Sequence, residues 1–375
     1  MKIAINTRFL LPDKLEGIGR YTFEVVRRIV EKHPEHEYLF LFDRPYEDRY
    51  LFNSRVRPIV LPPPARHPLL WYLWFEYAVP YVLRKHRPDV FFSPDGYASL
   101  RAAVPTLMTV HDLAFEHFPA HTPKLVRAYY RYFTPRFCEH AAHLLAVSDY
   151  TAADIVQQYG ISRKKITVCG NAARDGFRPL NEPEKQAVRR QYSAGQPYFL
   201  YAGAIHPRKN VHRLIEAFTA FKAGAPRPAQ LLIAGRMAWQ AGPVQQAYEA
   251  SSAKADIHFL GFVPDQELHR LLGGARAFVY PSLFEGFGLP ILEAMEAEVP
   301  VITARAASMP EVAGEAALLV PPTDVEALAR ALARADADSS LRASLVEKGR
   351  LQRQQFSWDK TAAIVYHRLL RCAGQ

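Results

Sequence analysis

Short apolar runs alternate with amphipathic stretches along almost the whole chain, and this alternation limits the possible folds more than any other feature. In the first half we predict strands at residues 2–6, 38–42, 56–60, 90–92, 106–110 and 144–147. We predict helices at residues 20–31, 69–85, 123–140 and 149–159, the last with Ser148 as its N-cap. Strands that alternate with helices over short connections form parallel sheets covered on both faces.

The second half repeats this pattern. Strands are predicted at residues 198–202, 230–234, 257–260, 277–280, 299–303 and 317–320, and helices at 211–221, 265–272, 289–298 and 324–335. The stretch 171–183 between the halves is rich in Pro, Gly and Asn and is predicted to be a linker. The predicted fold class is therefore α/β, with two Rossmann-like, doubly wound domains facing a cleft. Ligands of such sheets bind at the carboxyl ends of the strands, which favours a nucleotide-dependent enzyme.

Composition excludes several other classes of protein. The chain has 375 residues, of which 49% are hydrophobic and 22% charged, which is typical of a globular protein and not of a disordered or collagen-like one. Its three cysteines, Cys138, Cys169 and Cys372, are too far apart for a local zinc site or redox pair. We expect them to be reduced packing residues.

The charge balance favours anionic partners. The formal net charge of +10 is spread over both halves, which suits nucleotide phosphates or anionic lipid, but also an ordinary basic surface. Residues 1–11 have strand character and no signal-peptide pattern, and the longest apolar run, 69–83, is broken by Glu76 and Pro80. We expect a cytoplasmic protein that can touch the inner face of the membrane.

Two short motifs in the first half follow predicted strands. Gly17 and Gly19 lie between a strand and a helix, where a glycine loop lets backbone N–H groups approach a phosphate; an ordinary turn is the alternative. His111, followed by Asp112, lies directly after the strand at 106–110. It is placed to bond a sugar hydroxyl or a phosphate from the cleft, unless a loop carbonyl already satisfies it.

The segment 203–210 (GAIHPRKN) joins a strand to a helix. Arg208 and Lys209 precede the helix, and Asn210 is predicted to cap it. Cations near the positive end of a helix dipole are unfavourable unless an anion lies between them. A diphosphate would supply that anion; two solvated surface cations are the alternative.

The segment 281–295 (PSLFEGFGLPILEAM) is the most specific motif. Gly286 and Gly288 permit an unusual turn, and Pro290 suits the first turn of a helix. Glu285 would then lie on the loop and Glu293 about one turn into the helix. Carboxylates are good acceptors for vicinal diols of a sugar and a ribose. The alternative is that Glu285 caps backbone amides and that Glu293 lies on the surface.

Together these motifs resemble glycosyltransferase family 4, a retaining family with the GT-B fold that includes bacterial hexosyl- and mannosyltransferases. The resemblance extends to Phe356-Ser357-Trp358 and the helix after it, which in the family returns to the first domain. It implies an acceptor-binding domain over residues 1–175 with the C-terminal helix 357–375. It implies a nucleotide-sugar-binding domain over residues 176–356.

The resemblance also implies roles for individual residues. Arg208 and Lys209 would neutralise the donor diphosphate, and His111 would lie at the reacting centre; with Glu285 these are the predicted catalytic residues. The predicted donor-binding residues are Gly17, Gly19, Arg208, Lys209, Glu285, Gly286, Phe287, Gly288, Leu289 and Glu293, with Glu285 on the transferred sugar and Glu293 on the ribose. Residues 171–177 (NAARDGF) depart from the family's Asn-Gly-Val-Asp, so Asn171 and Asp175 receive no role.

The expected reaction is retaining transfer of a hexose from GDP-mannose or a UDP-sugar to a hydroxyl of a glycan or lipid-linked glycan. No cofactor and no metal are expected, because Arg208, Lys209 and helix N-termini would stabilise the leaving diphosphate. The Asp336-Ala337-Asp338 sequence lies away from every glycine loop and is predicted to be a helix boundary rather than a metal site.

Other functions stay open at this point. The segments 69–85 and 124–136 mix aromatic and basic residues, which suits either an anionic membrane or a protein core. A sugar-nucleotide epimerase of the same fold would need the nucleotide sugar but no acceptor. A non-catalytic basic protein for membrane or nucleic acid would not explain the glycines, cations and glutamates at strand ends, so no nucleic-acid partner is expected.

Overall fold

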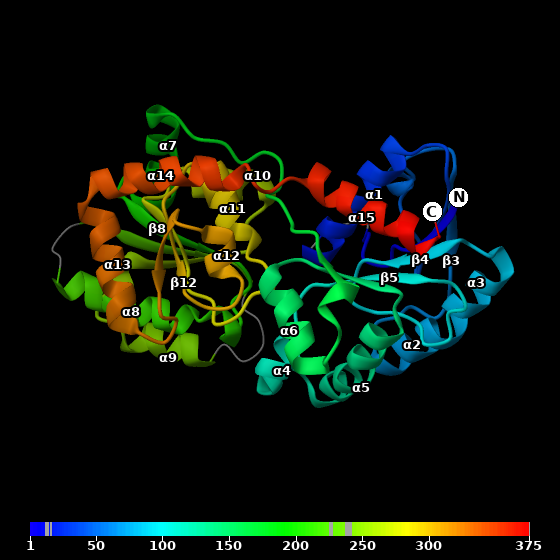
Figure 1. The fold of residues 1–375 in the computed structure, drawn as a ribbon. Helices are drawn as coiled ribbons and strands as arrows, with labels where there is room; N and C mark the ends of the chain where they lie inside the picture. Colours follow the sequence, from blue (N-terminus) through cyan, green and yellow to red (C-terminus); the bar gives the residue numbers. More distant parts are fainter. Residues whose placement is uncertain (12–14, 16, 225–227, 237–241, 375) are drawn as a thin grey trace. The chain divides into compact units, whose positions relative to one another are not determined.

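The structure is a computed structural model that describes residues 1–11, 15, 17–224, 228–236 and 242–374 (Figure 1). The chain forms two compact units. Unit 1 is Met1–Asn171 with Ser357–Gln375, and unit 2 is Ala172–Phe356. The boundary predicted after residue 175 lies in the same connecting stretch.

Unit 1 is built on a seven-stranded parallel sheet with the strand order β3-β2-β1-β4-β5-β6-β7. Its strands are β1 (Lys2–Asn6), β2 (Glu37–Phe42), β3 (Val56–Val60), β4 (Val90–Ser93), β5 (Thr106–Val110), β6 (His143–Ala146) and β7 (Ile166–Val168). The first six confirm the predicted strands to within one residue at each end. The central strands are buried along nearly their whole length, as expected for a sheet covered on both faces.

Helices cover both faces of this sheet (Figure 1). One face carries α1 (Gly17–Lys32) and α15 (Trp358–Cys372), which pack on each other. The other carries α2 (Pro68–Leu73), the π-helical turn Trp74–Ala78, α3 (Val79–His86), α5 (Lys124–His140) and α6 (Asp149–Tyr159), beside the short α4 (Ala114–His117). Ser148 caps α6 as predicted, since its hydroxyl accepts from the Thr151 amide at 3.0 Å. The hydroxyl of Thr361 donates to the Cys169 carbonyl at 3.0 Å, so the C-terminal helix belongs to unit 1, as predicted.

Unit 2 has a six-stranded parallel sheet with the order β10-β9-β8-β11-β12-β13. Its strands are β8 (Tyr198–Ala202), β9 (Gln230–Ala234), β10 (Ile257–Gly261), β11 (Ala277–Tyr280), β12 (Val301–Ala304) and β13 (Ala317–Val320). One helical layer holds α8 (Val211–Gly224), α9 (Gly242–Ala250) and α13 (Val325–Ala337). The other holds α7 (Glu182–Ser193), α10 (Asp265–Gly274), α11 (Leu289–Glu296), α12 (Met309–Ala313) and α14 (Ser339–Arg353).

Five helices and one strand were not predicted. Helix α7 begins inside the stretch predicted as a linker, because Asn181 and Glu184 form a capping box: each side chain accepts from the other residue's backbone amide. Helices α9 and α14, the short helices α4 and α12, and strand β7 were also missed. Asp338 separates α13 from α14 and caps α14 by accepting from the Leu341 amide at 2.8 Å, which confirms the predicted helix boundary.

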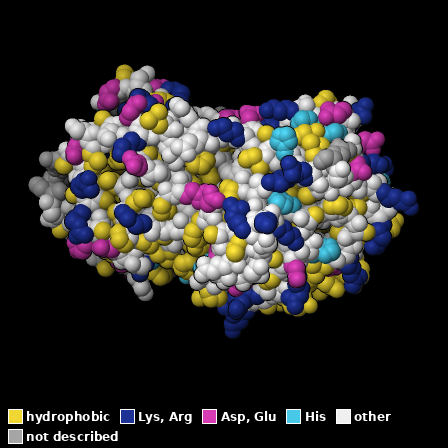
Figure 2. Space-filling view, viewed as in Figure 1, with side chains coloured by type: hydrophobic (Ala, Val, Ile, Leu, Met, Phe, Trp, Pro, Cys, Tyr) yellow, Lys and Arg dark blue, Asp and Glu magenta, His cyan; other side chains and the backbone are white. Residues whose placement is uncertain are grey.

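Cys138 and Cys169 are buried and all three cysteines are free, in agreement with a packing role. Basic side chains are spread over both units on the face shown in Figure 2, and are not gathered into one patch. Within the described residues, no helix is both long enough and apolar enough to span a bilayer.

Candidate functional site

The carboxyl ends of β8 and β11 bring two of the predicted motifs of unit 2 together. The two strands are hydrogen-bonded neighbours, so the segments that follow them start side by side. The Leu283 amide donates to the Arg208 carbonyl at 2.8 Å, and the Arg208 guanidinium donates to the Phe284 carbonyl at 2.5 Å. These bonds fix the cation-bearing turn against the glutamate-bearing loop.

Lys209 and Glu285 form the centre of this arrangement. The Lys209 Nζ lies 2.6 Å from Glu285 Oε1 and 2.9 Å from the Tyr280 hydroxyl, while Arg208 Nη1 lies 3.5 Å from Glu285 Oε2. Burial alone would raise the pKa of the Glu285 carboxyl, but the charges of Lys209 and Arg208 outweigh it and hold that pKa below its usual value. Glu285 is therefore ionised, and the cluster carries two positive charges and one negative.

The sequence predicted that these two cations need an anion, and in the structure Glu285 supplies it. The side chains of Arg208 and Lys209 are only 19% and 16% exposed, so they are not solvated surface cations. One net positive charge remains in the cluster. It offers a largely desolvated cationic site to a phosphate, where electrostatic attraction is stronger than in bulk water.

Asn210 has a different role from the predicted helix cap. Its φ of 63° is in the left-handed region, whereas an N-cap residue is usually extended. Its fully buried side chain donates instead to the carbonyls of Pro281 at 3.0 Å and Pro322 at 2.6 Å. Asn210 therefore ties together the segments that follow β8, β11 and β13.

The glycine-rich loop before α11 has the predicted geometry. Gly288 has a φ of 104°, a conformation that favours glycine, and Pro290 lies in the first turn of α11, which starts at Leu289. The hydroxyl of Ser308 lies 2.8 Å from the carbonyl oxygens of both Glu285 and Phe287. Ser308 is buried and holds the loop in place through these two carbonyls. Sequence reasoning did not identify it.

Glu293 lies on α11, as predicted, but with a partner that the sequence did not indicate. Arg174 makes a bidentate ion pair with it, from Nε to Oε1 at 2.6 Å and from Nη2 to Oε2 at 3.0 Å, and also contacts Asp265 Oδ1 at 2.8 Å. Burial would lower the pKa of Arg174, but the bonds and charge of Glu293 raise it. Glu293 is only 5% exposed, which excludes the alternative of a surface carboxylate.

In unit 1 the structure corrects the prediction for Gly17 and Gly19. Both belong to the first turn of α1, not to a loop before it. The N–H groups of a helix's first turn have no intrahelical partner, so this turn can still offer backbone N–H groups to a phosphate. A Cβ on Gly19 would lie 2.5 Å from the Phe9 carbonyl oxygen, whereas a Cβ on Gly17 would meet no atom of the described residues within 4 Å. Gly19 therefore serves packing, and packing does not explain Gly17.

His111 follows β5 as predicted, and a loop carbonyl does bind it. Its Nε2 lies 2.7 Å from the Pro94 carbonyl oxygen, and its ring meets that of Tyr21 edge-on at 5.0 Å. A carbonyl only accepts, so Nε2 carries the proton and Nδ1 presents a lone pair. Burial lowers the pKa of His111, which keeps the ring neutral near pH 7. Asp112 accepts from the Ala114 amide at 2.9 Å and does not orient His111.

Sequence reasoning missed a buried ion pair at the carboxyl ends of β1 and β4. Arg8 Nε lies 2.5 Å from Asp95 Oδ2, and both side chains are almost fully buried. The guanidinium lies over the rings of Phe75 and Tyr97, at 5.1 and 4.1 Å from their centroids. The rule that selected His111, a polar residue just after a predicted strand, would have selected Arg8 too.

Most aromatic residues of the two aromatic–basic segments belong to the core of unit 1. Trp74, Phe75 and Tyr129 are buried, and Trp71 and Phe133 pack against them. The large apolar side chains of these segments that remain exposed are Leu69, Leu73, Tyr77, Tyr81, Leu125 and Tyr132. The core interpretation therefore accounts for most of these aromatics.

Among the described residues, no group of three or more His, Cys, Asp or Glu side chains is placed to hold a metal ion.

Comparison with known proteins gives the family. The family described as "Glycosyltransferase Family 4" matches residues 15–174, and "Glycosyl transferases group 1" matches residues 184–352. O-antigen chain mannosyltransferase B of Escherichia coli is 31% identical over 374 residues, covering 95% of this chain and 97% of its own. O-antigen chain mannosyltransferase RfbU of Salmonella typhimurium is 30% identical over 263 residues, or 68% of each chain.

The fold is also that of solved glycosyltransferases. The crystal structure of Anabaena HepE with UDP and glucose superposes with a TM-score of 0.75 at 18% identity, covering 98% of this chain and 99% of HepE. Two parallel sheets with covering helices, together with this likeness, establish the two-domain GT-B fold. The near full-length match to a mannosyltransferase and the two family matches lead to one conclusion: the chain belongs to glycosyltransferase family 4 and is a glycosyltransferase.

Proposed function

We propose that this enzyme transfers mannose from GDP-mannose, with retention of the anomeric configuration, to a hydroxyl of a glycan or lipid-linked glycan in the assembly of an O-antigen-type polysaccharide. The names of the relatives from Escherichia coli and Salmonella typhimurium support mannose and the O-antigen. A UDP-sugar is the second donor to test, because HepE was solved with UDP and glucose.

The observation that carries the proposal is the cluster of Arg208, Lys209 and Glu285 at the carboxyl edge of the unit 2 sheet. Cleavage of a sugar–phosphate bond develops negative charge on the leaving diphosphate, and fixed cations in a poorly solvated place stabilise that charge. We assign this role to Lys209 and Arg208. Glu285 holds the two cations in place and receives the hydroxyls of the transferred sugar.

The remaining donor contacts follow from the loop and helix beside this cluster. Glu293 accepts the ribose hydroxyls, with its carboxylate held in one orientation by Arg174. The backbone from Gly286 to Leu289 follows the sugar and the phosphates. In unit 1, we assign Gly17 to the phosphates and the lone pair of His111 Nδ1 to a sugar hydroxyl.

The proposed reaction proceeds on one face of the sugar. The bond between the anomeric carbon and the phosphate oxygen breaks, and its electron pair leaves with the nucleoside diphosphate. The acceptor oxygen forms its bond to the same carbon from the side that the diphosphate leaves, and a phosphate oxygen takes the hydroxyl proton. The anomeric configuration is thus retained, and no metal is needed because Arg208 and Lys209 carry the charge.

A panel of nucleotides followed by a transfer assay tests the proposal. We expect GDP to raise the melting temperature more than UDP or ADP, by an amount that grows with concentration. With GDP-mannose and a lipid-linked acceptor fraction, we expect a product of retained configuration by NMR and equal turnover after treatment with EDTA. Conversion of the nucleotide sugar without acceptor would instead indicate an epimerase, and an inverted product or loss of turnover in EDTA would refute the mechanism.

A further inference from the structure

Unit 2 contains a pocket at the edge of its sheet opposite to the proposed donor site. It has a volume of about 500 Å³ and is lined in part by Ala275 and Arg276, just before β11, and by Val299 and Pro300, just before β12. The proposed donor residues Arg208, Lys209 and Glu285 follow the carboxyl ends of β8 and β11. The pocket therefore lies at the amino-terminal edge of the same sheet and shares no lining residue with the donor site.

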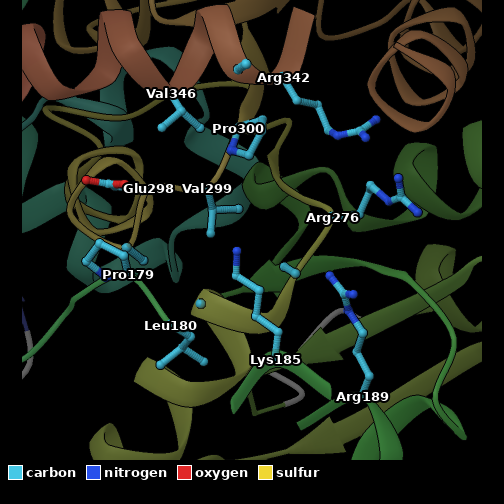
Figure 3. A pocket seen from close by; sticks show the side chains of 14 residues that line it. Pro179, Leu180, Lys185, Arg189, Arg276, Glu298, Val299, Pro300, Arg342 and Val346 are labelled. Atoms are coloured by element: carbon cyan, nitrogen blue, oxygen red, sulfur yellow. The ribbon is translucent and has the colours of Figure 1, made fainter. Parts of the chain in front are cut away.

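Four cationic side chains line this pocket. Lys185 and Arg189 come from α7, Arg342 comes from the first turn of α14, and Arg276 precedes β11. Figure 3 shows Lys185 and Arg189 on one side of the pocket, Arg342 on the other, and Arg276 between them in this view. Because they come from three separate parts of the chain, the fold itself gathers them.

One of these cations has a carboxylate close by inside the fold, since Arg276 Nε lies 3.8 Å from Asp336 Oδ1. The pocket-lining carboxylate, Glu298, is already held by Arg350 in a bidentate pair with distances of 2.8 and 2.5 Å. Arg342 donates at 2.8 Å to the carbonyls of Ala335 and Asp336, and its charge is paired with no carboxylate of the described residues.

The two cations from α7 are similarly placed. Arg189 donates to the Gly274 carbonyl at 3.2 Å, and its nearest carboxylate, on Glu182, is 3.7 Å away. The ammonium of Lys185 makes neither a hydrogen bond nor an ion pair within the described ranges of the chain. The donor edge differs, because there Lys209 is neutralised by Glu285 at 2.6 Å. The four cations of the pocket thus outnumber the carboxylates close to them, and a bound anion stabilises such an excess of like charge.

The other side chains that form the pocket wall are mostly apolar, so an anion that fits the pocket should also carry an organic part. Pro179, Leu180, Val299, Pro300 and Val346 form this part of the wall. A volume of this order is typical of sites for small organic ligands, in which a few polar groups fix an otherwise apolar contact. We propose that this pocket binds a small phosphate monoester, with its phosphate among Lys185, Arg189, Arg276 and Arg342 and its organic part against Val299 and Val346.

A free metabolite and a lipid headgroup share this phosphate chemistry. The lining residues come from separate parts of the chain and surround a hollow, whereas a bilayer presents a flat surface. The free ester is therefore the ligand that we infer. The inference does not depend on the proposed sugar transfer, because none of its residues takes part in that reaction.

Calorimetric titration of the full chain at low ionic strength tests this site. The probes are glucose 6-phosphate, inorganic phosphate, and glucose as the uncharged control. The test variant is Lys185→Glu, since Lys185 makes no side-chain bond that folding would lose. The matched control is Lys254→Glu, the same charge reversal at an exposed lysine of unit 2 outside the pocket. A Lys209→Gln variant reports binding at the donor edge.

We expect glucose 6-phosphate to bind the wild type, phosphate to bind more weakly, and glucose not to bind. Lys185→Glu should weaken the binding at least ten-fold, while Lys254→Glu and Lys209→Gln should stay within two-fold of the wild type. The double variant Lys185→Gln/Arg342→Gln should behave like Lys185→Glu.

Three results would overturn the inference. These are no binding of the ester to the wild type, equal binding to Lys185→Glu, or a loss of binding in Lys209→Gln alone, which would place the ester at the donor edge. Binding to phosphatidylglycerol vesicles, with none to the free ester, would assign the pocket to lipid and also contradict it.

Discussion

The two units have the same architecture but place different chemistry at the carboxyl ends of their strands. In unit 2, Lys209 and Glu285 form an ion pair in which both side chains keep some exposure, at 16% and 10%. In unit 1 the corresponding pair, Arg8 and Asp95, is only 4% and 1% exposed and lies among aromatic rings. A parallel sheet thus determines where a ligand binds, and the side chains that follow its strands determine which ligand binds there.

This difference separates the charged and uncharged parts of the proposed substrates. Unit 2 presents cations that a diphosphate can reach. After its strands, unit 1 presents a neutral His111 and an ion pair that is almost fully buried, which suits sugar hydroxyls better than phosphates. The part of unit 1 that we assign to the phosphates is Gly17, in the first turn of α1. Substitutions on both sides of this contrast test it.

Loss of the Lys209 charge should have the largest effect. Lys209→Gln should lower kcat/KM by about 10²- to 10³-fold, the usual cost of removing one group that stabilises transition-state charge. The same change also leaves Glu285 buried with only Arg208, which should lower the stability of the fold as well.

The double variant Lys209→Gln/Glu285→Gln separates these two effects. It should recover most of the melting temperature lost in Lys209→Gln, because the buried Glu285 charge is gone and Arg208 keeps its bond to the Phe284 carbonyl, but it should not recover activity. If activity returned together with stability, Lys209 would be a structural residue only.

The pair of Arg174 and Glu293 should have the next largest effect. Arg174→Gln and Glu293→Gln should each weaken the binding of the nucleoside diphosphate about ten-fold, a loss near 1.4 kcal/mol. Because Arg174 acts by orienting Glu293, the double variant should bind no more weakly than either single variant. Additive losses measured by calorimetry would show that the two residues act separately.

Glycine substitutions in unit 1 should separate packing from binding. Gly19→Ala should lower the melting temperature, because the new Cβ would lie 2.5 Å from the Phe9 carbonyl oxygen. The new Cβ of Gly17→Ala meets no atom within 4 Å in the part of the chain that the structure describes. This variant should therefore keep the melting temperature and lose activity several-fold if the backbone there approaches the donor. Full activity in Gly17→Ala would remove Gly17 from the site.

The smallest effect should come from the pH dependence of His111. Burial lowers its pKa in the folded state below the ordinary value of 6.5. The unfolded chain therefore binds a proton at His111 more readily than the folded chain does. The contribution of neutral His111 to the free energy of unfolding is complete above pH 6.5 and is lost as the pH falls through the lowered pKa of the folded state. His111→Gln lacks this contribution, and its stability in urea should fall less than that of the wild type below pH 6.5. Parallel curves for the two proteins would contradict the buried, neutral His111.

The elements predicted best are those whose apolar residues form the clearest pattern in the sequence. Strands β1, β5, β8 and β11 are short apolar runs between polar turns, and their bounds agree with the prediction. Helices α7 and α14 were missed because they are mostly polar, and β7 because it has only three residues. Hydrophobic periodicity in the sequence does not reveal helices and strands that contribute few apolar side chains to the core.

The candidate site was predictable in position but not in pairing. Glu285 and Glu293 were placed correctly because they follow a strand and start a helix. The pair of Arg174 and Glu293 spans 119 residues of sequence and depends on how α11 lies beside the start of unit 2. The side chain of Asn210 was also assigned wrongly, because its buried partners come from two other loops.

Calorimetric titration of a nucleoside and its diphosphate tests the central claim most directly. We predict that GDP binds the wild type tightly and binds Lys209→Gln/Glu285→Gln at least ten-fold more weakly, while guanosine binds both proteins equally. Such a result would place the diphosphate at the carboxyl edge of the unit 2 sheet. Equal affinity of the two proteins for GDP would contradict that placement.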